Sequence, residues 1–577
     1  MTTTTSSLQR RRWDVAPLAT AEVVRALRDY PPIMAQLLFN RGVRSVADAE
    51  AFLHPPASSP DDASRIPGAQ AAVERIMRAL RNRELIAVYG DFDADGVTSA
   101  ALLTEWLHSA GARLVPYIPD RVSEGHGLNL GAVQELHSRG VKLIVTADCG
   151  ITNHPEVAAA ADLGIDVVIT DHHTPPASLP MASAVVDPKL PGSPPAYAGL
   201  ASVGVAFTLC EALARELSVD LDPALLEFVA LGTIADMAPM TGLNRSLVRE
   251  GLARLNKSQR PGIRALLQAA RLELGHVDTE SVAFALGPRI NAPGRIDHAS
   301  PAYLLLTAPE MEEAQRLAEQ IDAANGERQR TTADVLAKVR DYLAQLEAMP
   351  PILILGDELF PAGIVGLAAG KLTEQCYRPS IVYQRGDREC RASCRSIPEF
   401  NIIEALRECD GKGPVRGEPV EPLFVRYGGH AQAAGFTIAT ERLPELERRL
   451  LAIAERKLAG QPLVPRIAID AEIPLGRING PLIKAMRDLA PFGLGNPTPI
   501  FLARDVEVRD MKAVGADGKH LRITLRDGAV AWTAMAFNAP PLEGSTPKRI
   551  DVVFNLSVDR FNGRETLRLN VVDFRRA

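Results

Sequence analysis

The segment that most constrains the fold is Leu85–Ser99, which reads LIAVYGDFDADGVTS. Its apolar first part predicts a buried parallel strand, and Thr98 or Ser99 is expected to cap a helix that starts near Ala100. Three aspartates alternate after the strand, at the edge where open α/β sheets bind ligands. At this spacing they repel one another unless hydrogen bonds or cations neutralise them. Taken alone, the segment fits a solvated acidic turn as well as it fits a binding site.

Length and composition limit the classes of protein to which this chain can belong. A chain of 577 residues is too long for one hydrophobic core, so about two to four domains are expected. No stretch approaches the ~18 apolar residues of a membrane helix, and Met1–Val15 lacks the apolar run of a signal peptide. Six cysteines without paired short spacing favour a reducing compartment, and we interpret Cys390 and Cys394 as buried thiols. We therefore expect a cytoplasmic protein with no membrane segment.

The charge is unevenly distributed along the chain. Residues 466–577 contain 17 Lys and Arg against 13 Asp and Glu, a net +4, whereas the whole chain carries −6. A basic end domain on an acidic body indicates a polyanionic partner, although a random scatter of charge explains it equally well.

Periodicity divides the chain into five regions. Residues 1–84 read as a disordered start over 1–20 followed by short helices. Across residues 85–240, strands alternate with helices, the signature of a parallel sheet in an α/β domain. Residues 241–349 are helical and end in Met311–Ala348, which predicts one long solvent-bridging helix between domains rather than a coiled coil.

The last two regions differ in pattern. Residues 350–460 predict a second α/β domain, in which the Pro/Gly-rich piece Gly411–Pro422 is an exposed insertion loop. Residues 466–577 carry five short strands with turns, which is typical of a small closed β-barrel such as an OB-fold. The predicted fold class is therefore α/β, with two α/β domains joined by a long helix and followed by an OB-like barrel.

Further acidic and histidine residues follow the other strands of the first α/β domain. One predicted strand ends at Asp148, the next ends at Asp171-His172-His173, and Asp236 lies in a neighbouring helix. Because consecutive strand ends of a parallel sheet share one edge, we expect Asp148, His172 and His173 to converge with the three aspartates. Such a concentration of carboxylates is costly unless cations neutralise it.

The ligand types indicate which cation. Mixed carboxylate and imidazole ligation suits Mn²⁺, or Mg²⁺ with more waters, better than a metal that prefers thiolates. The ligands are numerous enough for two ions, and two ions ~3.5–4 Å apart clamp the attacking and leaving oxygens of a phosphoryl displacement. We therefore predict a metal-dependent hydrolase with two ions.

At this point the motifs resemble a known family. The DFDADG segment, Asp148, the Asp-His-His triplet and Asp236 resemble the DHH phosphoesterase superfamily. Four further motifs are similar to those of the RecJ family within it, whose members are 5′→3′ exonucleases specific for single-stranded DNA. These four are GPRINAPGR (Gly287–Arg295), RASCRSI (Arg391–Ile397), YGGHAQAAGF (Tyr427–Phe436) and PFGLGNPTPIF (Pro491–Phe501). The resemblance covers roughly residues 30–575, and the insertion at Gly411–Pro422 departs from the family pattern.

The resemblance implies roles for individual residues. A metal-bound water would attack the phosphorus, and an arginine fork would recognise a 5′-phosphate. The implied metal ligands are Asp91, Asp93, Asp95, Asp148, His172 and Asp236, undivided between the two ions. The implied catalytic residues are Asp93, Asp95, Asp148, His172, His173 and His430. The implied substrate-binding residues are Arg121, Arg289, Ser393, Arg395, Gly429 and His430.

The resemblance also implies a biological setting. It predicts a cytoplasmic, monomeric enzyme that degrades single-stranded DNA from a 5′ end to mononucleotides in repair and recombination. A single-strand-binding protein and a helicase are the expected partners. A narrow channel between the two α/β domains would exclude a duplex, and the barrel would stack bases without reading their sequence.

Three alternatives stay open. A DHH-type phosphodiesterase for short oligonucleotides or cyclic dinucleotides would lack the barrel. A haloacid-dehalogenase-type phosphatase would use Asp93 as a covalent nucleophile, but it gives no role to the Asp-His-His triplet. A catalytically inactive replication scaffold would lose metal ligands, whereas every motif position is filled here.

Overall fold

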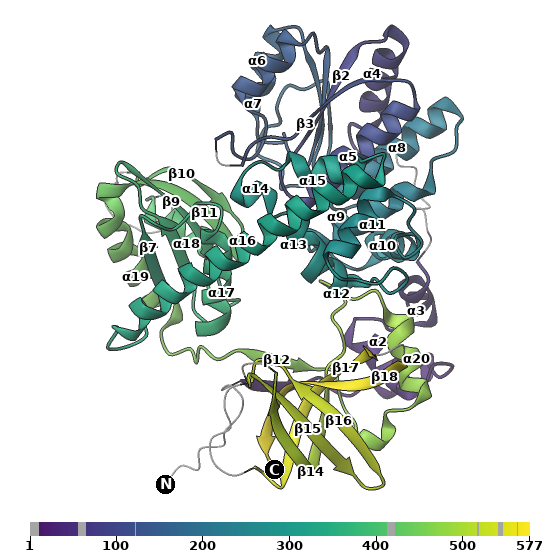
Figure 1. Ribbon diagram of the computed structural model, residues 1–577, viewed down its shortest axis with the longest axis vertical. Coiled ribbons are helices and arrows are strands. Elements are labelled where there is room, and N and C mark those ends of the chain that lie inside the picture. The colour runs from purple at the N-terminus through teal and green to yellow at the C-terminus, as the bar shows by residue number, and fades with distance from the viewer. Residues whose placement is uncertain are drawn as a thin grey trace. The chain divides into compact units, whose positions relative to one another are not determined.

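The computed structural model describes residues 11–55, 65–121, 123–411, 422–515, 518–539, 546–561 and 564–577, without the side chains of 558–565. Its internal contacts divide the chain into two compact units. Unit 1 comprises residues 1–60, 237–249 and 464–577, and unit 2 comprises residues 61–236 and 250–463. Figure 1 shows two sheets and a long helix in unit 2 and a barrel in unit 1.

The first sheet of unit 2 is entirely parallel, as predicted. Its strands run in the order β3-β2-β4-β5-β6, and helices cover both faces. The strands are β2 (Leu85–Gly90), β3 (Arg113–Tyr117), β4 (Leu143–Ala147), β5 (Asp166–Thr170) and β6 (Ala184–Val186). The covering helices are α4 (Ala69–Asn82), α5 (Ala94–Ser109), α6 (Leu130–Ser138), α7 (His154–Asp162), α8 (Ser202–Leu217) and α9 (Leu226–Ala235). The apolar faces of α6 and α7 pack on one side of the sheet in a core that includes Val133 and Val157.

The predicted start of α5 is wrong. The helix begins at Ala94, not near Ala100, and neither Thr98 nor Ser99 caps it. The Asp93 carboxylate is the cap, because its Oδ1 accepts hydrogen bonds from the N–H groups of Asp95 (3.0 Å) and Gly96 (3.1 Å). The acidic motif is therefore itself the first turn of the helix.

A helical region leads from the first sheet to the second. Its helices are α10 (Gly242–Leu255), α11 (Pro261–Ala269), α12 (Thr279–Ser281), the π-helix η3 (Val282–Leu286), α13 (Gly287–Ile290), α14 (Pro293–Ile296), α15 (Ser300–Thr307) and α16 (Met311–Ala344). The predicted single long helix is confirmed as α16. Its first half packs on α11 and α15, and Val335 and Val339 in its second half lie in the core beneath the second sheet (Figure 1).

The second sheet is mixed, with strand order β10-β11-β9-β8-β7. Its elements are β7 (Leu353–Asp357), α17 (Val365–Cys376), β8 (Ser380–Gln384), β9 (Glu389–Arg395), α18 (Ile402–Cys409), β10 (Phe424–Gly429), β11 (Ala433–Ala439) and α19 (Leu443–Leu458). Cys390 and Cys394 are free and buried in its core, which confirms them as buried thiols. Most of the insertion, residues 412–421, lies outside the described residues.

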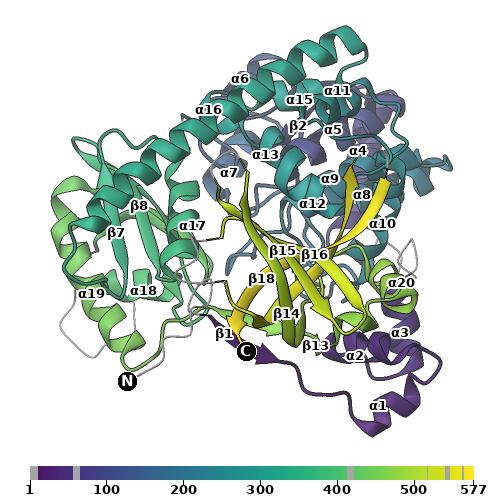
Figure 2. The ribbon, with the colours of Figure 1, turned by 60° about the horizontal axis from the view of Figure 1, so that its bottom comes forward.

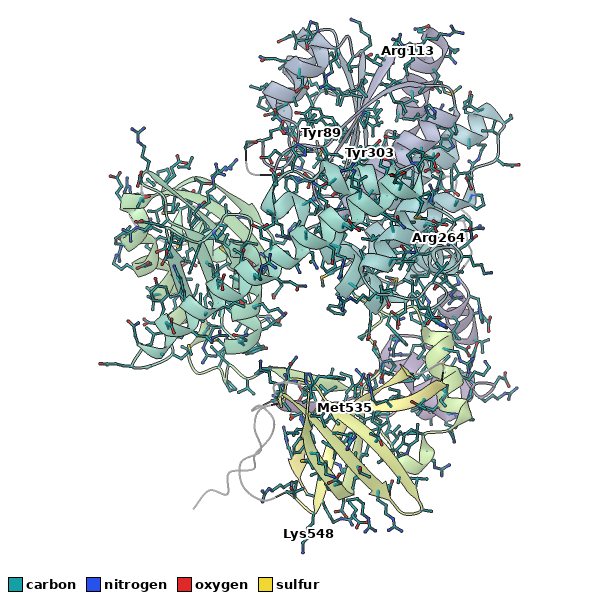
Figure 3. All side chains as sticks on the ribbon, viewed as in Figure 1. Tyr89, Arg113, Arg264, Tyr303, Met535 and Lys548 are labelled. Carbon is teal, nitrogen blue, oxygen red and sulfur yellow. The ribbon has the colours of Figure 1, made fainter. Side chains whose placement is uncertain are left out.

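Unit 1 contains the predicted barrel. The strands are β14 (Phe501–Val514), β15 (His520–Asp527), β16 (Val530–Ala536), β17 (Arg549–Phe561) and β18 (Arg564–Arg576), with the short β13 (Ala471–Glu472) beside β14. The β14–β17 pairing closes the sheet on itself (Figure 2). Met535 on β16 and Lys548 before β17 are labelled on this barrel in Figure 3.

The N-terminal segment belongs to the barrel unit. Residues 12–15 form strand β1 (Arg12–Val15), which pairs in parallel with β12 (Arg466–Ile469), so the predicted disorder of residues 1–20 is wrong for this part. Residues 1–10 lie outside the described residues. The helices α1 (Ala21–Ala26), α2 (Pro32–Asn40), α3 (Val46–Leu53) and α20 (Gly480–Leu489) add apolar side chains to the barrel's core. Among the described residues, no helix is long and apolar enough to span a membrane.

Candidate metal centre and phosphate site

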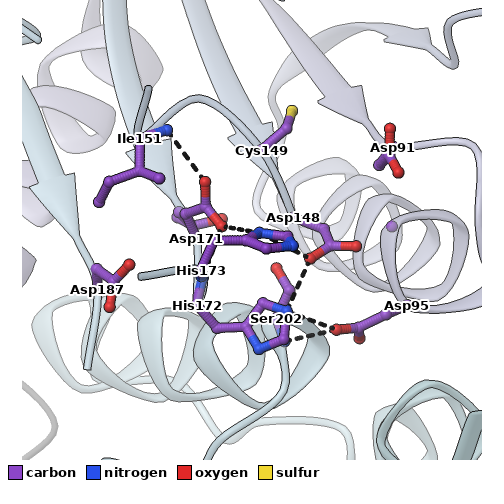
Figure 4. A network of polar contacts seen from close by, with 12 residues as sticks. Asp91, Asp95, Asp148, Cys149, Ile151, Asp171, His172, His173, Asp187 and Ser202 are labelled. Atoms are coloured by element: carbon purple, nitrogen blue, oxygen red, sulfur yellow. Dashed lines mark hydrogen bonds and ion pairs between the residues drawn. The ribbon is translucent and has the colours of Figure 1, made fainter. Parts of the chain in front are cut away.

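The carboxyl ends of β2, β4 and β5 bring acidic and histidine side chains together (Figure 4). Three overlapping groups have ligand atoms within 4.8 Å of one another: Asp91, Asp93 and Asp148; Asp95, His172 and Asp236; and Asp148, His172 and His173. His172 lies at the centre, with Nε2 3.1 Å from Asp148 Oδ1 and Nδ1 3.9 Å from Asp236 Oδ2. All six predicted metal ligands and His173 therefore lie at one site.

Backbone and side-chain hydrogen bonds fix the orientation of this cluster. The two carboxylate oxygens of Asp95 accept hydrogen bonds from the N–H groups of Ser202 (2.7 Å) and Val203 (3.0 Å), at the start of α8. Asp171 accepts hydrogen bonds from the N–H groups of Ile151 (3.0 Å) and His172 (2.7 Å). Asp171 Oδ1 also lies 2.7 Å from Nδ1 of His173, so Asp171 orients both histidines that follow it.

The electrostatics of the cluster favour a bound cation. Burial, followed by repulsion from neighbouring carboxylates, raises the pKa of Asp95 to about 7 and that of Asp236 to about 8. The same two causes raise the pKa of Asp148. Burial lowers the pKa of His172 to about 4, which leaves a neutral imidazole with a lone pair at neutral pH.

One buried carboxylate oxygen, Asp91 Oδ1, also favours a bound cation. Among the described residues, nothing donates a hydrogen bond to Asp91 Oδ1, although the side chain is buried. Buried carboxylates that repel one another, an unpaired carboxylate oxygen and a neutral imidazole fit divalent cations that accept oxygen and nitrogen ligands.

The GPRINAPGR motif joins the metal cluster to the second sheet's domain. Asn291 Oδ1 accepts a hydrogen bond from the N–H of Ala94 (2.8 Å) in the first turn of α5. A Cβ at Gly294 would lie 3.1 Å from the backbone oxygen of Phe92, so the motif packs closely on the DFDADG segment. Arg295 in turn donates a hydrogen bond to the carbonyl of Gly363 (3.3 Å), just before α17.

Arginines gather beside this junction. Arg395 Nη1 donates a hydrogen bond to Ser393 Oγ (3.3 Å), so these two predicted phosphate residues are adjacent on β9. Burial, with repulsion from Arg121, Arg328 and Arg395, lowers the pKa of Arg295 to about 9. Arg121 and Arg395, which were predicted to bind substrate, thus share a strongly positive region with Arg295 and Arg328. No role was predicted from the sequence for Arg295 or Arg328.

Arg289 has a partner of its own. Its Nε donates a hydrogen bond to Asp322 Oδ1 on α16 (2.9 Å), and Nη1 donates to the carbonyl of Ala285 (3.0 Å). The positive charge of Arg289 also acts on Arg328, because burial and repulsion from Arg289 together lower the pKa of Arg328. Arg289 therefore lies at the edge of the arginine group and is held by the long helix.

The structure places His430 apart from the metal cluster. It is exposed in the turn between β10 and β11, and none of the metal-ligand groups found among the described residues includes it. Gly429 has φ of +133°, and a Cβ there would lie 2.5 Å from the carbonyl oxygen of Ala433. The hairpin's own second strand therefore requires a glycine at this position, and the implied role of Gly429 in substrate binding stays a prediction.

Besides Arg328, three contributors to the site were not predicted from the sequence. His126, whose Nδ1 lies 3.2 Å from Asp91 Oδ2, is in a loop with no motif around it. Asp171 belongs to the Asp-His-His triplet, and only its contacts reveal that it orients the histidines. Arg295 lies inside GPRINAPGR, so its motif was visible although its role was not.

Comparisons with known proteins agree with this geometry. Family models match residues 85–233 (DHH family, N-terminal domain), 328–458 (DHHA1 domain) and 469–573 (RecJ OB domain). The chain is 36% identical over 546 residues to the single-stranded-DNA-specific exonuclease RecJ of Bacillus subtilis (strain 168), covering 94% of this chain and 68% of that protein.

Comparison with solved structures also finds similarity to RecJ proteins. The crystal structure of RecJ in complex with Mn²⁺ from Thermus thermophilus is similar with a TM-score of 0.83 and 31% identity, covering 98% of this chain and 80% of that one. The structure of RecJ in complex with Mg²⁺ from the same organism has a TM-score of 0.76 and 29% identity, covering 98% and 79%.

Proposed function

This chain belongs to the RecJ family, and we propose that it is a metal-dependent exonuclease that degrades single-stranded DNA from the 5′ end to mononucleotides. The observation that carries the proposal is the convergence of five aspartates and two histidines at one sheet edge. The relatives' name supplies the substrate class, and the Mn²⁺ and Mg²⁺ complexes of the related enzyme support these two cations.

The metal ligands in this proposal are those of the cluster. Asp91, Asp93, Asp95, Asp148, His172 and Asp236 would hold the two ions. When bound, the ions supply a water of lowered pKa as the nucleophile and neutralise the charge on the phosphoryl oxygens. His173 donates Nδ1–H to Asp171, which leaves its Nε2 to contact the scissile phosphate. His430 would contact the same phosphate from the second α/β domain, beside Gly429.

The direction of cleavage is proposed to come from the arginines. Ser393 and Arg395 would bind the terminal 5′-phosphate together with Arg289, and Arg121 would add a further contact. A guanidinium fork matches a phosphate dianion and a hydroxyl adds one donor, so the end of the strand is recognised rather than its sequence. A chain anchored by its 5′-phosphate then presents the next phosphodiester to the metal cluster.

The specificity for single strands and the biological role are also proposed from the similarity to the RecJ family. A channel between the two α/β domains would admit one strand and exclude a duplex, and the barrel would stack bases by their faces. We propose a role in DNA repair and recombination in the cytoplasm, as a monomer beside a helicase and a single-strand-binding protein.

The decisive experiment removes one ligand without disturbing the backbone. Asp148 has φ of +68°, a region that Asn adopts more readily than most residues, so Asp148→Asn is preferred to Asp148→Ala. With Mn²⁺ and a 3′-labelled, 5′-phosphorylated single strand, we expect stepwise shortening by the wild type. We expect a loss of about 10²-fold or more in the variant, because each ligand supports several kcal/mol of charge stabilisation.

Controls separate the alternatives. Asp162→Asn, on the exposed face of α7, is expected to match the wild type. Degradation of the duplex form at the same rate would contradict the proposed strand specificity. Binding without degradation by both wild type and Asp148→Asn would favour an inactive scaffold. Cleavage confined to dinucleotides would favour the short-oligonucleotide phosphodiesterase.

A further inference from the structure

The loop between β3 and α6 carries two side chains onto the DFDADG segment. The Arg121 guanidinium lies 4.5 Å from the centre of the Phe92 ring, and the His126 ring meets the same ring edge-on at 6.3 Å. Phe92 is buried between two proposed metal ligands, Asp91 and Asp93. One aromatic ring of the acidic motif therefore contacts both of these side chains.

Among the described residues, the close polar contact of His126 is with a proposed metal ligand. Its Nδ1 lies 3.2 Å from Asp91 Oδ2. The His126 side chain is 48% exposed, so burying apolar surface does not explain its place. Its ring also meets that of His173 edge-on at 5.2 Å, which puts it beside the centre of the metal cluster.

The loop around His126 is anchored on both sides. Tyr89, labelled in Figure 3, donates a hydrogen bond from its hydroxyl to the carbonyl of Gly127 (3.0 Å). Glu124 accepts hydrogen bonds from Tyr117 Oη (2.7 Å) and Asn129 Nδ2 (2.8 Å). These contacts hold the segment that carries His126 against the sheet.

A second anchor lies at the next residue. Asn153 accepts a hydrogen bond from the N–H of Leu128 (3.2 Å) and donates one to its carbonyl (3.1 Å). Gly127 has φ of +91°, and a Cβ there would lie 2.5 Å from Asn153 Oδ1. Glycine is the residue that fits this backbone conformation and close contact, so Gly127 helps to fix the position of the loop beside Asp91.

We propose that His126 is a positioning residue that orients the Asp91 carboxylate toward a bound divalent cation. This inference rests on the proposed function. By donating Nδ1–H to Oδ2, His126 fixes the plane of the carboxylate, whose other oxygen, Oδ1, is not part of this contact. Oδ1 is the buried oxygen to which no described residue donates a hydrogen bond, so it is the atom left for the ion. Partners of this kind raise metal affinity by holding a ligand in its binding orientation.

The test measures Mn²⁺ binding as well as activity. His126→Phe keeps a ring beside Phe92 but removes the donor, and His126→Asn places an amide N–H near the position of Nδ1. Titration of the metal-free protein, followed by the electron paramagnetic resonance signal of free Mn²⁺, is expected to show about 10- to 100-fold weaker binding for His126→Phe. His126→Asn is expected to recover most of that loss. His137→Phe, on the exposed face of α6, serves as the matched control and is expected to bind like the wild type.

A coupling measurement separates positioning from a general structural effect. In an Asp91→Asn background, His126→Phe is expected to cause no further loss of Mn²⁺ affinity, because the contact it removes is already gone. Wild-type affinity in His126→Phe, or the same additional loss in both backgrounds, would overturn the inference. If the wild type binds Mn²⁺ but degrades no DNA, the proposed function fails, whereas the inference on His126 is still decided by the affinities.

Discussion

At the scale of single residues, aspartate serves several purposes within one site. Asp93 caps α5, Asp95 is held by the first N–H groups of α8, and Asp171 fixes two histidines. The convergence of the acidic residues was predictable, because parallel strands end at one edge and each predicted strand ended in an acid. Asp171 and His126 were not predictable as contributors, because their roles depend on contacts that no spacing encodes.

Arg395 gives a test of end recognition. Replacing Arg395 with Gln removes the charge beside Ser393 but keeps a polar side chain of similar length. We expect the preference for a 5′-phosphate over a 5′-hydroxyl to fall about tenfold or more, since a charge-assisted hydrogen bond contributes about 1.5–3 kcal/mol. Rates on the two substrates, measured side by side, check this. An unchanged ratio of rates would exclude Arg395 from the phosphate site.

Glu211 on α8 gives a pH-dependent prediction away from the site. Burial raises its pKa from 4.5 to about 7, and Arg215 lowers it only in part. Because the folded pKa is above the unfolded one, ionisation costs nothing below pH 4.5, and its cost grows from pH 4.5 to 7 and is complete above pH 7. Glu211→Gln is expected to be more stable than the wild type above pH 7, by about 1–2 kcal/mol after allowance for partial exposure.

Urea unfolding of both proteins at about pH 8 and near pH 5 measures this difference. The advantage of Glu211→Gln is expected to shrink toward zero at the lower pH. An advantage that is constant with pH would mean that the substitution acts through packing and not through ionisation.

At the scale of elements, the types of helix and strand were more predictable than their ends. The parallel sheet, the long helix and the barrel followed from periodicity. The start of α5 did not, because Asp93 acts as a cap only when its carboxylate turns back onto the next N–H groups. The junction made by α13 and α14 was also missed in detail, since its close approaches involve glycines far apart in sequence.

A substitution at Gly363 tests whether the junction between the GPRINAPGR motif and α17 positions the site. A Cβ at Gly363 would lie 2.2 Å from the backbone oxygen of Arg295, so Gly363→Ala must push the segment before α17 away from the motif. We expect a marked loss of nuclease activity together with lower thermal stability. Gly370→Ala, inside α17, meets nothing closer than 4.0 Å and is expected to keep activity and gain about 0.5–1 kcal/mol in stability. Equal behaviour of the two variants would show that the junction does not position the site.

At the scale of the whole molecule, sequence order and spatial order differ. Unit 1 is assembled from three separate stretches of the chain, and no periodicity links a helix near residue 35 to a barrel after residue 464. The family was nevertheless predictable from motif order, and the similarity to relatives confirms it.

Arg245 connects the three stretches of unit 1. It is fully buried and donates hydrogen bonds to the carbonyls of Phe52 (2.8 Å), Asp488 (3.0 Å) and Leu489 (2.7 Å). Arg245→Leu removes one donor from each of these buried carbonyls, so we expect a loss of about 3–5 kcal/mol in the unfolding free energy of unit 1. Arg254→Leu, at a part-exposed position of the same helix, is expected to cost less than about 1 kcal/mol. Equal losses in urea unfolding would contradict this role.

The pairing of β1 with β12 has a consequence for synthesis on the ribosome. The segment that forms β1 and α1–α3 leaves the ribosome early, but its partners after residue 464 are made about 400 residues later. At roughly 5–20 residues per second, the apolar faces of these first helices wait on the order of 20–80 s for their core. Unit 2 is complete before unit 1 can close, so a nascent chain passes through a stage with a finished catalytic unit and an unfinished barrel.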